Sequence, residues 1–167
     1  MKVILVAAMS ADGKIAESPE QNSLDWTSKE DTAFFVKKTK EAGLVIMGQT
    51  TFQTIGKPLK DRRLIVLTRE PEQYPSQEGI EFVNVPVQTI LDTLTQEGVE
   101  QVVIAGGSSV YSQFLQGGHV TDIFLTVEPL LFGEGIPLAS GFDRVHMELV
   151  EVGRIGEHGV LIHYRVK

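Results

Sequence analysis

The chain has 167 residues, of which 42% are hydrophobic and 22% are charged, and its formal net charge is −7. This length and composition are typical of an ordinary globular domain with a sizeable core. The acidic balance argues against partners that need a broadly basic face, namely nucleic acid and anionic membranes. The sequence contains no cysteine, which excludes disulfides, thiolate metal sites and a cysteine nucleophile.

The first predicted element is a strand over residues 2–9, because a continuous apolar run is typical of a strand buried on both faces. The run is short and an acid follows it, so we interpret it as a core strand and not as a signal peptide or a membrane span. We therefore expect a cytoplasmic protein. The histidines show no metal-ligand spacing, so no metal site is predicted; they are His119, His146, His158 and His163.

Residues 16–25 are polar and predict a flexible loop, and residues 26–43 predict an amphipathic helix. Thr27 and Glu30 have capping-box spacing at its start, and Gly43 closes it. Strands and helices then alternate: strands are predicted at 44–48, 62–68, 80–85, 101–107 and within 120–133, and helices at 49–56, 87–98 and 109–118.

The tail, residues 147–167, predicts a β-hairpin around Gly156, because two apolar alternations flank glycines. Alternating strands and helices followed by two closing strands predict an α/β fold, with a mostly parallel sheet and an antiparallel edge. We find no linker, so residues 1–167 are predicted to form one domain. Ligands of such sheets lie beyond the carboxyl ends of the strands, which makes the turns after residues 9, 48, 68, 105 and 127 the candidate sites.

The stretch VVIAGGSSVYSQFL, residues 102–115, ends a predicted strand at Gly106 and Gly107 and then begins a helix. Glycines allow a ligand to approach the backbone, and a helix start offers unpaired N–H groups to an anion. The alternative is an ordinary tight turn. The similar turn at residues 48–51 favours the anion-binding interpretation.

Three segments resemble dihydrofolate reductase in order and spacing: LDWTSKEDTAFFVKKT at 24–39, VIMGQTTFQTIGKPLKDRR at 45–63 and AGGSSVY at 105–111. The resemblance extends over roughly the whole chain. It implies a three-layer α/β/α fold and reduction of 7,8-dihydrofolate by hydride transfer from NADPH to C6, with protonation at N5.

Two other segments, AAMSADGKIA and LTVEPLLFGEGIPL, resemble the pyrimidine reductase of riboflavin biosynthesis, which shares this fold and cofactor. The GEGIP segment stands where dihydrofolate reductases usually carry an acidic D-T-x-F-P run. The alternatives are therefore a reductase of a ribosylaminopyrimidine phosphate and a nucleotide-binding protein without catalysis. The sequence leaves monomer or homodimer open.

The dihydrofolate reductase resemblance implies a set of NADPH-binding residues, with the pyrophosphate on the backbone N–H groups of residues 107–110. Gln49 replaces a common arginine and cannot offer charge to the 2′-phosphate, so Arg69 takes that role and Thr68 adds a hydroxyl. The cofactor-binding candidates are Ala7, Ile15, Gly48, Gln49, Thr50, Thr51, Thr68, Arg69, Ala105, Gly106, Gly107, Ser108, Ser109, Val110 and Tyr111.

The same resemblance implies that Asp31 faces the pterin ring, binds its 2-amino group and N3, and supports protonation at N5. Asp31 also fits a plain helix-start acid, but its spacing from Trp26 and Phe35 favours the catalytic role. The predicted catalytic residues are Asp31, Thr126 and Trp26.

Arg62 resembles the arginine that holds the folate α-carboxylate, with its neighbour Arg63 as the alternative. The substrate-binding candidates are Val6, Asp31, Thr32, Phe35, Ile55, Leu59, Arg62 and Thr126. Residues 16–25 match the mobile loop that closes over the site and excludes water, and Glu134 is a candidate to hold that loop.

Overall fold

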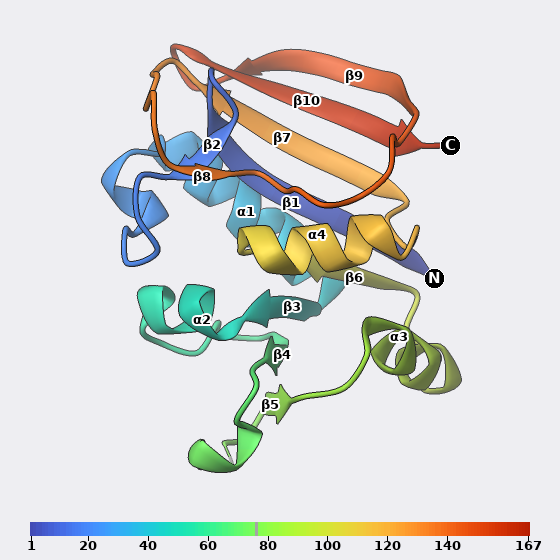
Figure 1. Cartoon of the computed structure of the whole chain (residues 1–167). Coiled ribbons are helices and arrows are strands. Elements are labelled where there is room, and N and C mark those ends of the chain that lie inside the picture. Colours follow the sequence, from blue (N-terminus) through green and yellow to red (C-terminus); the bar gives the residue numbers. More distant parts are fainter. Residues whose placement is uncertain (76) are drawn as a thin grey trace.

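An eight-stranded sheet organises the computed structural model, which describes residues 1–75 and 77–167 (Figure 1). The strand order is β5-β4-β3-β6-β1-β7-β10-β9. The strands from β5 to β7 are parallel, and β10 is antiparallel to both β7 and β9. Their bounds are β1 Lys2–Ser10, β3 Leu44–Gly48, β4 Arg63–Leu67, β5 Ile80–Val83, β6 Gln101–Ile104, β7 Asp122–Glu128, β9 Met147–Ile155 and β10 Gly159–Val166. The mostly parallel sheet and the antiparallel C-terminal strand are confirmed.

Helices cover both faces of the sheet; they are α1 Lys29–Ala42, α2 Gln49–Ile55, α3 Val87–Gln96 and α4 Ser108–Gln116. Alternate residues of a strand point to opposite faces, and β3 shows this division. Val45 and Met47 pack with side chains of α1 and α2, whereas Leu44 and Ile46 pack with side chains of α3 and α4. The fold is therefore the predicted three-layer α/β/α arrangement (Figure 1).

The start of α1 differs from the predicted capping box. The N-cap is Ser28, whose Oγ accepts a hydrogen bond from the backbone N–H of Asp31 at 3.2 Å. Thr27 and Glu30 have the same spacing one residue earlier, so the pattern allowed two registers and the chain adopts the second. The predicted end is confirmed, because Gly43 has a φ of 71°, in the left-handed region.

The loop after β1 is tied to two other parts of the molecule. A short pair joins β2, Lys14–Ala16, to β8, Ile136–Pro137. Farther along, the Asn22 side-chain amide donates to the Thr54 carbonyl oxygen at 3.2 Å, just before the 3₁₀ helix η1, Ser23–Asp25. The sequence predicts a flexible loop here, and the structure shows ordered contacts at both ends. Glu134 is exposed, and the loop is held through β8.

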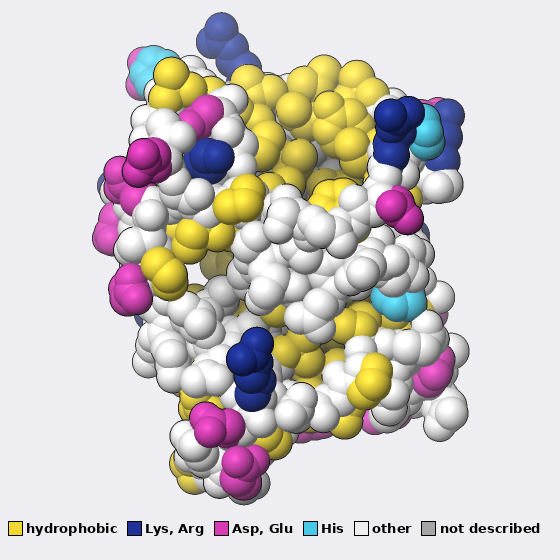
Figure 2. Space-filling model, viewed as in Figure 1, with side chains coloured by type: hydrophobic (Ala, Val, Ile, Leu, Met, Phe, Trp, Pro, Cys, Tyr) yellow, Lys and Arg dark blue, Asp and Glu magenta, His cyan; other side chains and the backbone are white. Residues whose placement is uncertain are grey.

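The β9–β10 hairpin around Gly156 is confirmed. Exposed apolar side chains gather on it, and Figure 2 shows them as a field at the top of the molecule; they are Met147, Leu149, Val150, Val152 and Val160.

No helix in residues 1–75 and 77–167 is long and apolar enough to cross a membrane. A second 3₁₀ helix, η2, covers Pro71–Gln73.

Candidate active site

A cavity of 1180 Å³ lies at the carboxyl ends of the parallel strands. It exceeds the volume that one drug-sized ligand needs, so it can hold two ligands side by side. The turns after residues 48, 68 and 105 line it as predicted. The turns directly after residues 9 and 127 do not. Their loops contribute farther along, the first through Ile15 and several residues of 16–27, the second through Ile136.

Two glycine turns of the cavity lining contact each other. The Gly48 N–H donates to the Gly106 carbonyl oxygen at 2.7 Å. Gly106 has a φ of 94°, and a Cβ there would lie 3.1 Å from the Tyr111 hydroxyl oxygen. A Cβ on Gly107 would lie 3.3 Å from Thr51 Oγ1. A side chain at either glycine would crowd the starts of α2 and α4, and Gly106 also has a backbone conformation that favours glycine.

The first turn of α4 presents backbone donors to the cavity. The N–H groups of Val110 and Tyr111 both donate to the Gly107 carbonyl oxygen at 3.0 Å. The sequence predicted that the backbone N–H groups of residues 107–110 bind an anion. Because the Val110 N–H is already bonded, the N–H groups of residues 107–109 remain as candidates. Within the described residues no side chain caps this helix start, and a helix start of this kind suits an anion such as a phosphate group.

Arg69 lines the cavity just after the end of β4. Its carbonyl oxygen accepts from the Asn84 side-chain amide at 3.1 Å, while its side chain is exposed. Beside it, the buried Thr68 hydroxyl donates to the Gln49 side-chain oxygen at 2.6 Å. Sequence reasoning missed Asn84, and its position after the neighbouring parallel strand β5 was the available signal.

Asp31 lies in the first turn of α1 and is only 9% exposed. Burial raises the pKa of its carboxyl above the ordinary 3.8; a hydrogen bond with the Thr126 hydroxyl lowers it, and the nearby Glu128 charge raises it further. The Trp26 indole nitrogen is buried and finds no partner within the described residues. Its ring packs edge-on against Phe132, with centroids 5.2 Å apart.

Thr126 does not line the cavity but lies behind Asp31 on β7, where it is 1% exposed. It is the one predicted site residue outside the lining. Glu128, two residues later on the same face of β7, was missed by the sequence analysis. The period of two along a strand was the signal that could have found it.

Arg62 and Arg63 have different surroundings. The Arg62 guanidinium donates from Nη1 to the Thr39 hydroxyl at 2.7 Å and from Nε to the Lys60 carbonyl at 3.0 Å, at the cavity wall. Burial lowers the pKa of Arg62. Arg63 instead bridges two surface acids, Glu81 and Glu97, outside this cavity. Of these two neighbours, Arg62 is the one that lines the cavity.

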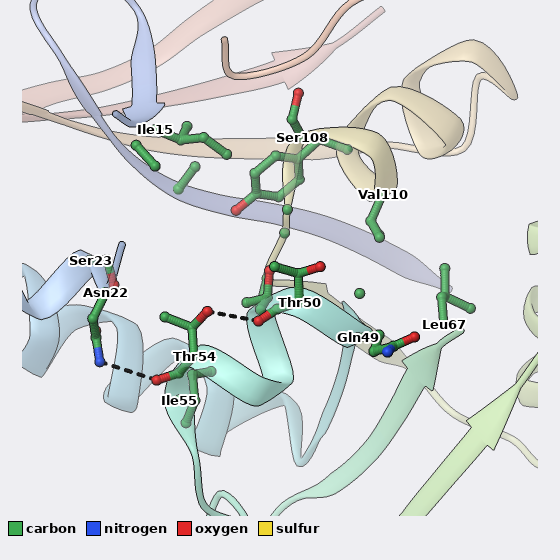
Figure 3. Close-up of a pocket in the computed structure, with 18 of the residues that line it drawn as sticks. Ile15, Asn22, Ser23, Gln49, Thr50, Thr54, Ile55, Leu67, Ser108 and Val110 are labelled. Carbon is green, nitrogen blue, oxygen red and sulfur yellow. Dashed lines mark hydrogen bonds between the residues drawn. The ribbon is translucent and has the colours of Figure 1, made fainter. Parts of the chain in front are cut away.

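The remaining predicted residues all line the cavity, together with polar residues that were not predicted. Figure 3 shows Ile15 and Ser108 across the cavity from Thr50 and Ile55 of α2, with Asn22 bonded to the end of that helix. The predicted lining residues not yet placed are Val6, Ala7, Thr32, Phe35, Leu59, Ala105 and Ser109; those not predicted include Lys57, Lys60 and Gln113.

The sequence of the chain is similar to a known protein family over most of its length. The family model described as dihydrofolate reductase matches residues 2–128. The chain is 29% identical to the uncharacterized protein YwjB of Bacillus subtilis, over 98% of this chain and 97% of that protein. It is 33% identical to dihydrofolate reductase HdrB of Haloferax volcanii, over 75% and 64% of the two chains.

Solved structures of similar fold include a bifunctional enzyme of Thermotoga maritima, a diaminohydroxyphosphoribosylaminopyrimidine deaminase and 5-amino-6-(5-phosphoribosylamino)uracil reductase. The TM-score is 0.80 at 22% identity, and the match covers 99% of this chain and 56% of that chain. At this identity the likeness concerns the fold.

Proposed function

Because the chain belongs to the dihydrofolate reductase family, we propose that it reduces 7,8-dihydrofolate to tetrahydrofolate with NADPH. The family is one of oxidoreductases, and the cavity has room for two ligands. The choice of dihydrofolate rests on one observation. A buried acid, Asp31, and a guanidinium held in place, Arg62, line the same cavity.

Arg62 is suited to a carboxylate partner. Two of its N–H groups are already committed to Thr39 and Lys60, so the guanidinium is oriented before a ligand arrives. The planar fork then presents its other N–H groups for two-point recognition of a carboxylate. The α-carboxylate of the glutamate tail is the group of dihydrofolate that needs such a partner.

Asp31 is suited to hold a proton and to orient the ring. Burial raises the pKa of its carboxyl, so the acid keeps its proton at a higher pH than in water. The carboxyl binds the 2-amino group and N3 of the pterin and supports protonation at N5 through water. The Trp26 N–H, which has no partner among the described residues, is a buried donor available to such a water.

The cofactor half of the cavity consists of the two glycine turns, the first turn of α4 and Arg69. When bound, NADPH supplies the hydride. The chain's own groups hold it: the N–H groups of residues 107–109 bind the pyrophosphate, and Arg69 binds the 2′-phosphate. Residues of the loop at 16–25 line the cavity, and in this proposal the loop excludes water during hydride transfer.

The test is a steady-state assay of the parent protein and two matched variants, with dihydrofolate and with a dihydropterin that lacks the glutamate tail. Arg62→Lys should raise the KM for dihydrofolate about 5- to 150-fold, because lysine keeps the charge and loses the two-point geometry. It should change the KM for the tailless pterin much less. Arg63→Lys is the control and should leave both KM values near the parent's. Equal effects of Arg62→Lys on both substrates would contradict the assignment.

A second candidate activity is reduction of a ribosylaminopyrimidine phosphate. The observation that favours it is a group of three cations at the cavity, Lys57, Lys60 and Arg62, because a phosphate accepts several positive partners. The same assay separates the two candidates. Turnover of the pyrimidine phosphate by a parent protein that does not turn over dihydrofolate would replace the first proposal with the second.

A further inference from the structure

Glu128 is a second buried carboxylate beside Asp31, at the end of β7. Its side chain is 4% exposed. Its Oε1 accepts a hydrogen bond from the Ser28 backbone N–H at 2.7 Å, across 100 residues of sequence. Its Oε2 faces β10, where a Cβ on Gly159 would lie 3.5 Å away. Glu128 is therefore enclosed between the start of α1 and the β10 strand.

A short chain of hydrogen bonds links Glu128 to Asp31. Ser28 is the residue that Glu128 holds, and it is also the N-cap of α1. Its Oγ accepts from the Asp31 N–H at 3.2 Å, and its carbonyl oxygen accepts from the Thr32 N–H at 3.1 Å. The first turn of α1, with Asp31 in it, is thus fastened to β7 through one side chain.

The alternation of β7 brings two functional side chains toward α1. Thr126 and Glu128 lie on the same face of the strand, because side chains two apart share a face. The first offers Asp31 a hydroxyl and the second places a negative charge nearby. A like charge close to a carboxyl disfavours its ionised form.

We propose that Glu128 is a positioning residue that acts through Asp31: it fastens the N-cap of α1 to β7, and it places a second acidic side chain close to the Asp31 carboxyl. The effect of Glu128 on turnover rests on the proposed function. The structural link between Glu128 and Asp31 does not rest on it, because the link is present in the protein without substrate.

Other titratable groups surround the pair. The buried Tyr111 hydroxyl of α4 donates to the Val6 carbonyl oxygen at 2.7 Å. Burial, and then the charge of Asp31, raise the pKa of this hydroxyl, so it stays neutral. Ser10 of β1 is paired with Glu128 in the sheet and donates to Asp12 at 2.6 Å. That bond is the main reason why the pKa of Asp12 is lowered to about 2, so Asp12 stays ionised. Glu30 is exposed on α1 and faces the β9–β10 turn.

The direct test is carboxyl ¹³C NMR of aspartate-labelled protein without substrate, titrated with pH. Asp31→Asn identifies the Asp31 signal. In Glu128→Gln the side-chain amide oxygen can still accept the Ser28 N–H while the charge is removed. The midpoint of the Asp31 titration should then fall by about half a pH unit or more. Glu30→Gln removes an exposed acid of the same helix turn and is the matched control, with a clearly smaller shift expected.

A second readout uses turnover. When kcat is plotted against pH, the part of the curve between acid and neutral pH should shift in Glu128→Gln. The shift should have the same direction as that of the NMR midpoint. A residue that only stabilises the fold would leave that part of the curve in place. If Glu128→Gln does not fold, Glu128→Asp withdraws the charge by one methylene and should give a smaller fall of the midpoint.

An unchanged Asp31 midpoint in the folded variant, or a shift no larger than that of Glu30→Gln, would overturn the inference. A parent protein without dihydrofolate turnover would instead overturn the proposed function, and the NMR titration would still decide the role of Glu128.

Discussion

Asp31 has a location that is unfavourable for stability. Burial raises the pKa of its carboxyl in the folded protein, whereas in the unfolded chain the carboxyl returns to about the ordinary 3.8. The folded state therefore binds this proton more tightly than the unfolded state. Its contribution to stability is complete below 3.8 and is lost as the pH rises through the folded-state pKa. Above the folded-state pKa, the ionised Asp31 destabilises the fold.

Asp31→Asn should therefore raise the stability of the protein at pH 7 and lower its turnover. At pH 7 the variant should have a higher free energy of unfolding than the parent protein, and this difference should shrink toward pH 4. Turnover should fall by about 100-fold or more, because an amide cannot hold the proton. Urea unfolding at both pH values and a kcat measurement check this. A variant that is less stable by the same amount at both pH values would show that Asp31 is only a helix-start acid.

At the residue scale, the sequence predicted which residues line the cavity better than it predicted their partners. The spacing that matches a known family brought Asp31, Arg62 and Arg69 to one cavity, as expected. Whether Arg62 or Arg63 faces a ligand could not be read from the sequence, because the choice depends on Glu81 and on contacts far along the chain. The link from Glu128 to Ser28 spans 100 residues, and no local pattern contains it.

At the element scale, the start of α1 predicts that substitutions of two neighbouring residues, Ser28 and Thr27, lower the free energy of unfolding by different amounts. Ser28→Ala should lower the free energy of unfolding by about 1 kcal/mol, because it removes the acceptor of the Asp31 N–H. Thr27→Ala is the control and should lower it by less than half as much, because Thr27 lies before the cap. Urea unfolding of both variants gives the comparison. Equal losses would mean that the cap is shared between the two residues.

The main helices and strands were predicted because their apolar runs and their glycine ends are local signals. The β2 and β8 strands were not, because each has only two or three residues and forms through a partner about 120 residues away. The N-cap of α1 was predicted one residue early, since two positions satisfied the same spacing. Local chemistry limits such a choice to a few candidates, and tertiary contacts select one of them. The assignment of residues 1–167 to one domain stays a prediction.

At the scale of the whole molecule, the cavity forms only from the folded chain, because residues between Val6 and Ile136 line it. A ligand of this cavity therefore binds the native state and stabilises it. NADPH at 100 times its Kd should add about 2.7 kcal/mol, which corresponds to an increase in Tm of about 5–10 °C for a chain of this size. Thermal unfolding with and without cofactor measures this increase.

Arg69→Ala should reduce the NADPH increase toward that of NADH and leave the NADH increase unchanged, because only NADPH carries the 2′-phosphate. Arg144→Ala removes an exposed arginine away from the cavity and should leave both increases unchanged. Equal losses with the two cofactors would place Arg69 outside the phosphate site.

The α2 helix has only seven residues, and its two ends face different parts of the cavity. Its first turn meets the glycine turn at Gly107, and its last turn carries Ile55 and accepts the Asn22 amide. A rigid element of this length transmits a displacement from one end to the other. Two ligands bound at these two ends would be energetically coupled through α2, and the factor by which either changes the affinity for the other would be the same in both directions.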